Sequence, residues 1–206
     1  MTDARTEVLR RIRTALAAAP PETTVIHRDY DRAPLHGPAD IERFAETVAD
    51  YRARVLRIRV ADISSTIASL VSSGAVVAIP DDLPVGWVAE VSTMRDDPAT
   101  RLSTDRLESA AAVVTGCAVG IAATGTIVLD GGATQGRRAL TLVPDHHICV
   151  VFDDQVVDTV PQGFAALNPL RPLTFISGPS ATSDIELERV EGVHGPRTLD
   201  VLIVTR

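Results

Sequence analysis

Short apolar runs separated by polar stretches fill the sequence from residue 40 onward. The runs at residues 75–79 and 148–152 are apolar at successive positions, which predicts strands that are covered on both faces. Residues 54–60 instead alternate between arginine and apolar residues, which predicts a half-buried strand. The predicted strands are 54–60, 75–79, 113–114, 127–129, 140–143, 148–152, 174–177 and 199–204.

Helical patterns occupy much of the sequence between these strands. Asp40 is a candidate N-cap, and Gly74 ends the helix that starts at Asp62. The predicted helices are 4–18, 40–52, 62–71, 104–110, 154–160 and 183–190. Buried strands interleaved with helices indicate an α/β fold, a mostly parallel sheet sandwiched by helices. The function of such a sheet lies in the loops beyond its strand ends.

The N-terminal segment differs from the rest of the sequence. Val8, Ile12 and Leu16 follow helical spacing, whereas residues 19–39 contain several prolines and a glycine. We therefore predict an N-terminal helix and extended arm over residues 1–39 and a folded domain over residues 40–206. The charged N-terminus has no apolar leader and no apolar run is long enough to span a membrane, so we expect a cytoplasmic protein.

All 20 basic residues are arginines, and 27 acidic residues give a net charge of −7. The absence of lysine excludes Schiff-base chemistry and a standard P-loop. The acidic balance argues against nucleic acid as a partner. Cys117 and Cys149 are far apart in sequence, so we expect buried free thiols. An iron–sulfur cluster normally takes four cysteines, so this chain alone cannot hold one.

The turn at Thr124, Gly125 and Thr126 is the first candidate for ligand binding. Gly125 allows a ligand to approach the backbone, and the two hydroxyls can form hydrogen bonds with it. A tight turn between two strands explains the same residues equally well. The following Asp130-Gly131 is itself a hairpin signal.

Arg137 and Arg138 follow Gly136 and suit a carboxylate or phosphate ligand. The alternative is a solvated rim held by salt bridges. His146 and His147 would point to opposite faces of a strand, so a metal site that uses both is geometrically poor. One of the two could be catalytic while the other packs, although a packing role for both is the simpler interpretation.

The most informative segment runs from Ser177 to Glu186. A strand, a small-residue loop and a helix N-terminus in series are typical of an anion site. A capping box at Ser183 and Glu186 explains part of this pattern without a ligand. His194 lies between glycines and is a candidate general acid or base, or a structural bridge between loops. The ligand-binding residues that we predict are Thr124, Gly125, Thr126, Arg137, Arg138, Ser177, Gly178, Ser180 and Asp184, and the candidate catalytic residues are His194 and Glu186.

Together these segments resemble the lactate-utilisation protein C family, the LUD-domain proteins. Three stretches match in order: the Thr124–Thr126 turn with residues 136–142, the Ser177–Glu186 loop, and residues 192–197. The resemblance implies a fold similar to that of the glucosamine-phosphate deaminase, ribose-phosphate isomerase and CoA-transferase group. It also implies a role in oxidising L-lactate beside a cysteine-rich subunit and a ferredoxin-like iron–sulfur subunit, which would carry the clusters. No cofactor or metal is expected in this chain.

Ala123 departs from the family pattern, which commonly has a glutamate before Thr-Gly-Thr. The missing lysine also separates the chain from lysine-dependent members of that fold group. We therefore expect an accessory subunit of a lactate-oxidising complex that binds a small anion or partner subunits. The alternatives are a stand-alone enzyme that acts on a phosphorylated or carboxylated metabolite and a binding module without chemistry of its own.

Overall fold

The computed structural model describes residues 4–18, 25–30, 39–182, 190–191 and 195–206. The chain forms two units, Met1–Tyr30 and Asp31–Arg206. In the first unit, helix α1 (Ala4–Ala18) matches the predicted helix. Glu7 binds Arg10 and Arg11 along its polar side, at 2.7 and 2.8 Å. Its apolar side chains, Val8 and Ile12 among them, are exposed.

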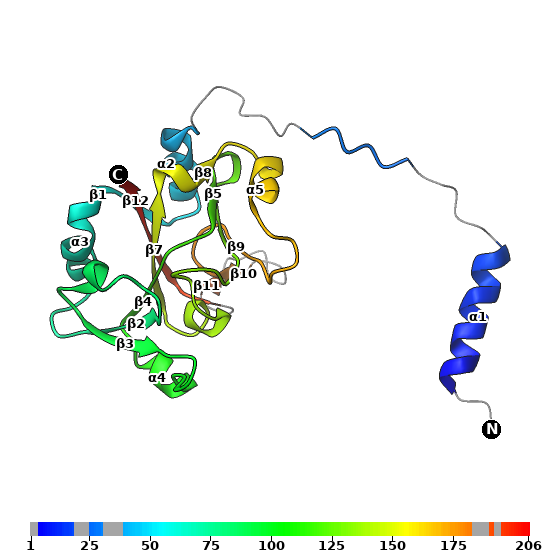
Figure 1. Cartoon of the computed structure of the whole chain (residues 1–206), viewed down its shortest axis with the longest axis horizontal. Coiled ribbons are helices and arrows are strands. Elements are labelled where there is room, and N and C mark those ends of the chain that lie inside the picture. The colour runs from blue at the N-terminus through cyan, green and yellow to red at the C-terminus, as the bar shows by residue number, and fades with distance from the viewer. Residues whose placement is uncertain (1–3, 19–24, 31–38, 183–189, 192–194) are drawn as a thin grey trace. The chain divides into compact units, whose positions relative to one another are not determined.

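A six-stranded parallel sheet forms the centre of the second unit (Figure 1). Its strands are β1 (Arg54–Arg59), β2 (Val76–Pro80), β3 (Ser92–Asp96), β4 (Ala112–Thr115), β7 (His146–Phe152) and β12 (Thr198–Thr205). Their order in the sheet is β1-β12-β7-β4-β2-β3, and every pairing is parallel. This confirms the predicted α/β fold with a mostly parallel sheet.

Alternate residues of each strand point to opposite sides of this sheet, and apolar side chains occupy both sides. Helices cover both faces and bury these side chains. The helices of this unit are α2 (Ile41–Asp50), α3 (Ile63–Leu70), α4 (Thr104–Glu108) and α5 (Val160–Ala166). Helix α3 packs against Ile148 and Val150 of β7, whereas α2 packs on the side of Cys149 and Val151. Figure 1 shows α3 and α2 on opposite sides of β7.

A second, four-stranded sheet packs on the α2 side and was not anticipated. It consists of β5 (Val119–Ile121), β6 (Thr126–Leu129), β8 (Val156–Val157) and β9 (Thr174–Ile176), in the order β8-β5-β6-β9. Strands β5 and β6 are antiparallel, so Thr124 and Gly125 form the tight turn between two strands that was one interpretation of this segment. Between β9 and the last strand β12, the chain forms a short antiparallel pair, β10 (Ala181–Thr182) and β11 (Val190–Glu191).

Three local predictions were wrong. Residues 140–143 form the end of the 3-10 helix η4 (Arg138–Thr141) and the turn after it. The prediction failed because so short an apolar run does not distinguish strand from helix. The predicted helix at 154–160 is instead β8 preceded by η5 (Asp153–Gln155), and α5 starts only at Val160. No hairpin closes at Asp130-Gly131, since β6 pairs with β5 and β9. The predicted helix at 183–190 lies almost wholly outside the described residues.

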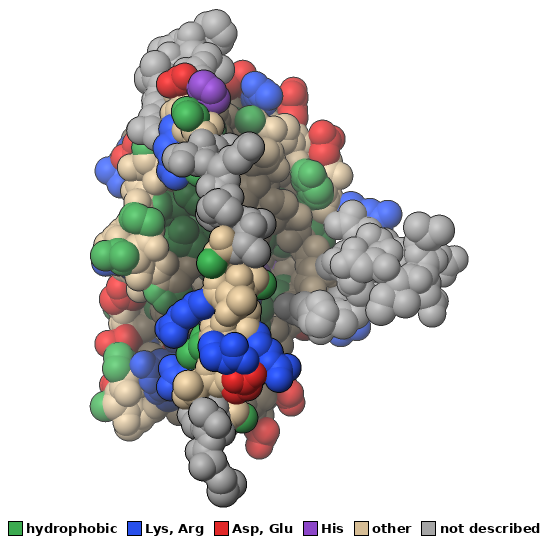
Figure 2. Space-filling model, turned by 90° about the vertical axis from the view of Figure 1, so that its right-hand side faces the viewer, with side chains coloured by type: hydrophobic (Ala, Val, Ile, Leu, Met, Phe, Trp, Pro, Cys, Tyr) green, Lys and Arg blue, Asp and Glu red, His purple; other side chains and the backbone are tan. Residues whose placement is uncertain are grey.

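The remaining 3-10 segments connect the main elements and complete the second unit. They are η1 (Val60–Asp62), η2 (Val85–Val88) and η3 (Ala122–Thr124). On the face drawn in Figure 2, acidic and basic side chains are interspersed with apolar ones. Among the described helices, none has the length and hydropathy needed to cross a membrane.

Asp200 of β12 is completely buried and binds two cationic or polar partners. Arg54 approaches both of its carboxylate oxygens, at 2.6 and 2.7 Å, and His146 Nε2 lies 2.7 Å from Oδ2. Burial raises the pKa of Asp200, but the hydrogen bonds from Arg54 and His146 outweigh it and hold that pKa below its usual value. The cluster joins the start of β7 and β12 to β1.

Gly125 provides the first prediction, because its φ is +56° and an added Cβ would lie 2.5 Å from the Thr47 backbone. Gly131 has a similar φ of +65° but open space around it. Gly131→Ala should cost about 1–2 kcal/mol of unfolding free energy from the left-handed backbone alone. Gly125→Ala should cost clearly more, since α2 must also move. Urea denaturation of the two variants measures the difference, and equal losses would contradict this close contact.

Asp200 provides the second prediction. Because its pKa is lowered in the folded state, its contribution to stability is present above the unfolded value of about 3.9 and is lost as the pH falls further. Asp200→Asn should lose about 1–3 kcal/mol at neutral pH, since Arg54 keeps access to water. Its unfolding free energy should then fall less steeply below about pH 4 than that of the wild type. Asp50→Asn, an exposed carboxylate on α2, is the control, and a matching acid profile for the two variants would contradict the assignment.

Candidate functional site

Two adjoining cavities lie between the six-stranded sheet and strand β9. The larger has a volume of about 700 Å³ and the smaller about 290 Å³. Arg138, Thr141 and Thr174 line both, so the two cavities meet at these three residues. Ligand pockets in proteins are usually about 300–1,000 Å³, so the smaller cavity suits a ligand of a few heavy atoms.

The smaller cavity contains several of the predicted ligand-binding residues. Ser177, Gly178 and Ser180, which follow β9, line it together with His147 from the start of β7. His147 is only 1% exposed, and its Nε2 lies 2.8 Å from Thr115 Oγ1. The cavity therefore combines hydroxyl groups with one fixed imidazole, a side chain able to donate or accept a proton.

Behind Ser177, a chain of hydroxyls connects the other predicted turn to the cavity. Thr126 Oγ1 lies 2.7 Å from Thr124 Oγ1 and 2.8 Å from Ser177 Oγ. Pairing between β6 and β9 brings these residues together across 51 positions of sequence. Thr124 and Thr126 thus orient Ser177, whereas Ser177 itself faces the cavity.

The loop after β9 is held close to neighbouring backbone. Gly178 has a φ of +83°, and an added Cβ would lie 2.5 Å from the carbonyl oxygen of Tyr51. Ser180 N donates to the carbonyl of Pro196 at 2.8 Å. Gly178 therefore allows the loop to approach Tyr51. This glycine, predicted as a ligand contact, has a structural role in the loop.

Arg137 and Arg138, adjacent in sequence, have different surroundings. Arg137 binds the buried Asp96 at 2.8 and 3.1 Å and the carbonyl of Leu102 at 2.6 Å. Burial raises the pKa of Asp96. The hydrogen bonds from Arg137 and the Leu102 backbone, with the charges of Arg137 and Arg101, outweigh this effect and lower that pKa. The exposed Arg138 guanidinium has no hydrogen bond or ion pair to any residue within the described part of the chain, and it lies where the two cavities meet.

The larger cavity is bounded by a loop that its own side chains hold in place. Gln135, which is 4% exposed, accepts hydrogen bonds from the backbone N–H groups of Asp130 and Gly131 at 2.6 and 3.1 Å. Asp130 in turn binds Arg171 at 2.8 Å. These hydrogen bonds fix the backbone of Asp130 and Gly131, and both residues line the larger cavity.

The predicted site residues do not include His147, Gln135 and Arg171, which line the two cavities. His147 was one of the two adjacent histidines, and only its position at the start of a buried strand could have indicated a cavity-facing side chain. Gln135 begins the segment that contains Arg137 and Arg138, but its hydrogen bonds to the Asp130–Gly131 backbone could not be predicted. Arg171 gave no signal, because its partner Asp130 is 41 positions away. His194, Glu186 and Asp184 fall outside the described residues, although Gly195 and Pro196 line the smaller cavity.

The polar side chains of the site determine what it can bind. Within the residues that the structure describes, no group of three or more His, Cys, Asp or Glu side chains is placed to hold a metal ion. Ala123, at the position of the glutamate common in the resembling family, donates its backbone N–H to Asp158 O at 2.9 Å. What the described site presents to a ligand is one unpaired guanidinium, several hydroxyls and an imidazole.

The sequence model of the LUD domain matches residues 41–204. The chain belongs to the LUD-domain family. This match covers the second unit from the start of α2 to β12, so both cavities lie within the family domain. The resemblance seen in the sequence motifs is confirmed.

Known relatives agree with this assignment. A protein of Deinococcus radiodurans named "Lactate utilization protein C" is 44% identical over 207 residues, which cover 98% of this chain and 96% of the relative. A protein of the same name from Geobacillus kaustophilus is 33% identical over 153 residues, and the match spans 63% of its length. The crystal structure of a DUF162 family protein from Deinococcus radiodurans superimposes with a TM-score of 0.68 at 41% identity, covering 80% of this chain and 95% of that one.

The contrast between Arg137 and Arg138 provides the third prediction. Arg137→Gln removes the main partner of a buried carboxylate and should cost about 1–3 kcal/mol of unfolding free energy. Arg138→Gln should change that free energy by no more than about 0.5 kcal/mol, because the exposed side chain has no protein partner among the described residues. Chemical denaturation of both variants measures this, and comparable losses would show that Arg138 is also structural.

Proposed function

We propose that this chain acts in lactate utilization as an accessory subunit that binds a small carboxylate in the smaller cavity. The observation that carries the proposal is the 44% identity, over 98% of the chain, to a protein named for that process. The cavity supports it, because Arg138, Ser177 and Ser180 offer the groups that a small hydroxy acid or keto acid needs. We place this activity in the cytoplasm.

Arg138 is the expected anchor for the carboxylate. A guanidinium matches the two oxygens of a carboxylate in fork geometry, and Arg138 has its guanidinium available at the cavity wall. Ser177 and Ser180 then provide hydroxyls for the substituent on the neighbouring carbon. His147 contributes one further polar contact at the wall.

The electron-accepting centres are proposed to lie on partner subunits. The oxidation of a hydroxy acid requires an acceptor for two electrons, and the chain has only two cysteines, too few for a cluster of its own. We therefore expect a cysteine-rich subunit and a ferredoxin-like iron–sulfur subunit as partners. In that arrangement this chain binds and orients the acid, and the partners transfer its electrons.

A stand-alone enzyme is the second candidate, and the observation that favours it is the position of His147. A buried imidazole held by Thr115 at the wall of a cavity can move a proton to or from a bound ligand. The two candidates differ in what the purified chain can do. The first requires binding without turnover, whereas the second requires turnover by the chain alone.

Arg138→Gln provides the fourth prediction. Isothermal titration of the purified chain with L-lactate, pyruvate and inorganic phosphate should show binding of at least one small carboxylate. The substitution should weaken that binding by tenfold or more, about 1.4 kcal/mol, because the charged anchor is lost. Arg106→Gln is the matched control, since Arg106 is exposed on α4 and lines neither cavity.

Three outcomes would contradict the proposal. Binding of phosphate but of no carboxylate would show that the site takes a phosphorylated ligand instead. Equal weakening by Arg106→Gln would show that net charge, and not the cavity, determines affinity. Turnover of a hydroxy acid by the chain without partners would favour the stand-alone enzyme, and His147→Gln should then abolish it.

A further inference from the structure

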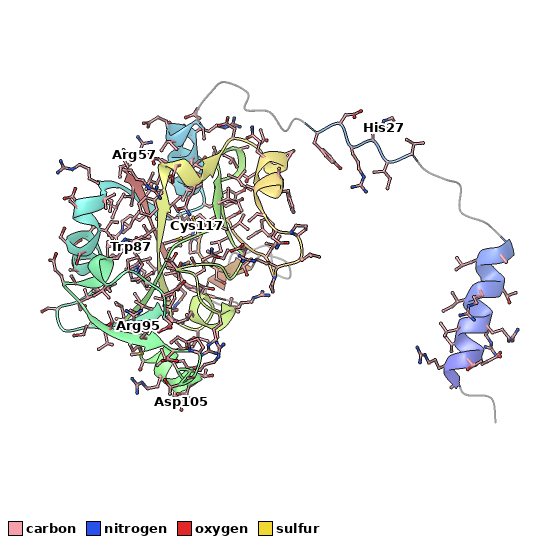
Figure 3. All side chains as sticks on the ribbon, in the orientation of Figure 1. His27, Arg57, Trp87, Arg95, Asp105 and Cys117 are labelled. Carbon is pink, nitrogen blue, oxygen red and sulfur yellow. The ribbon has the colours of Figure 1, made fainter. Side chains whose placement is uncertain are left out.

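The two cysteines of the chain are brought together in the core. Cys149 lies on β7, and its parallel neighbour in register is Thr115, the last residue of β4. Cys117 follows two residues after Thr115, and Cys149 Sγ lies 3.8 Å from the carbonyl oxygen of Gly116, the residue next to Cys117. Both cysteines belong to the same buried cluster. They are 32 positions apart in sequence, so the pairing of β4 with β7 brings them near each other. Figure 3 shows Cys117 in the interior of the second unit.

Polar groups surround this pair on several sides. Cys149 Sγ lies 4.0 Å from Thr115 Oγ1 and 3.8 Å from the carbonyl oxygen of Gly116. Cys117 Sγ lies 3.7 Å from Gln155 Oε1. His147 is two residues before Cys149 on the same strand, so both side chains face the same side of β7. Apolar surroundings raise the pKa of a buried thiol and make it unreactive, whereas polar neighbours can offset this effect.

These neighbours make the two thiols unequal. Hydrogen bonds from Cys117 and His147 hold the pKa of Cys149 below its usual value, despite burial. The hydrogen bond to Cys149, together with burial, raises the pKa of Cys117. Cys149 is therefore the sulfur that reacts as a thiolate, and Cys117 is the thiol that keeps its proton.

We propose that Cys117 and Cys149 form an oxidation site that takes hydrogen peroxide and closes to an intramolecular disulfide. The oxidation requires no ligand in either cavity, and so it goes beyond the proposed function. Both cysteines are buried, with exposures of 4% and 0%, so a small, water-sized oxidant is favoured over a bulky disulfide such as oxidised glutathione.

The chemistry needs peroxide as its only co-reactant. The Cys149 sulfur attacks one oxygen of peroxide, the O–O bond breaks, and the leaving hydroxide takes a proton to become water. Cys149 is then a sulfenic acid. The Cys117 sulfur attacks the Cys149 sulfur, the S–O bond breaks, and the departing hydroxide takes the Cys117 proton. Two thiols and one peroxide thus give one disulfide and two waters.

Intact-mass measurement of the folded full chain tests this proposal. After exposure to peroxide, the chain should lose both free thiols and the mass of two hydrogens, and dithiothreitol should restore both. Oxidised glutathione at the same concentration should react at least tenfold more slowly and leave no glutathione adduct. This measurement uses only the wild type, so it does not depend on the folding of a variant.

Two single variants assign the steps. Cys117→Ala should stop at the Cys149 sulfenic acid, which dimedone captures, because the resolving thiol is missing. Cys149→Ala should react with peroxide at least tenfold more slowly, since the activated sulfur is gone. Circular dichroism and melting temperature confirm that each variant is folded before its reactivity is compared.

Several results would overturn the proposal. The wild type could retain both thiols at peroxide concentrations that oxidise free cysteine. Oxidation could instead give dimers linked between chains, or could proceed equally fast in Cys149→Ala. Rapid formation of a glutathione adduct on the folded chain would also refute it, because that result requires an exposed thiol.

Discussion

The burial of both faces of β7 is the constraint on which the rest of the structure depends. Its central residues, 147–151, are all buried, with α3 packed against one face and α2 and the second sheet against the other. Because side chains alternate along a strand, Ile148 and Val150 are directed to the α3 side, while His147 and Cys149 are directed to the side of the second sheet. The imidazole of His147 and the thiol of Cys149 therefore face the same layer, the one that contains the second sheet.

The second sheet provides part of the walls of both cavities. Strand β9 pairs with β6 and places Ser177 beside Thr126. The segment before β7 places Arg138 where the two cavities meet. Asp96 binds the neighbouring Arg137 and thereby anchors this segment. Of these two adjacent arginines, one is paired with a buried carboxylate and the other lines both cavities.

The sequence predicted the parallel sheet because β2 and β7 contain uninterrupted apolar runs and β1 alternates arginine with apolar residues. The second sheet escaped prediction for the opposite reason. Strands β5 and β8 have only three and two residues, and their identity depends on pairing with partners far along the chain. Strand β3 (Ser92–Asp96) was also missed, because its sequence is largely polar and it lies at the edge of the sheet.

By itself, the sequence determined the fold class, the family and the hydroxyl and arginine motifs that characterise the site. It also excluded lysine chemistry and a cluster held by this chain alone. Only the tertiary structure decided which motif residues face a cavity, which arginine is already paired, and that His147 and the two cysteines share one side of β7. These properties depend on contacts between residues tens of positions apart, and local pattern and composition carry no information about such distances.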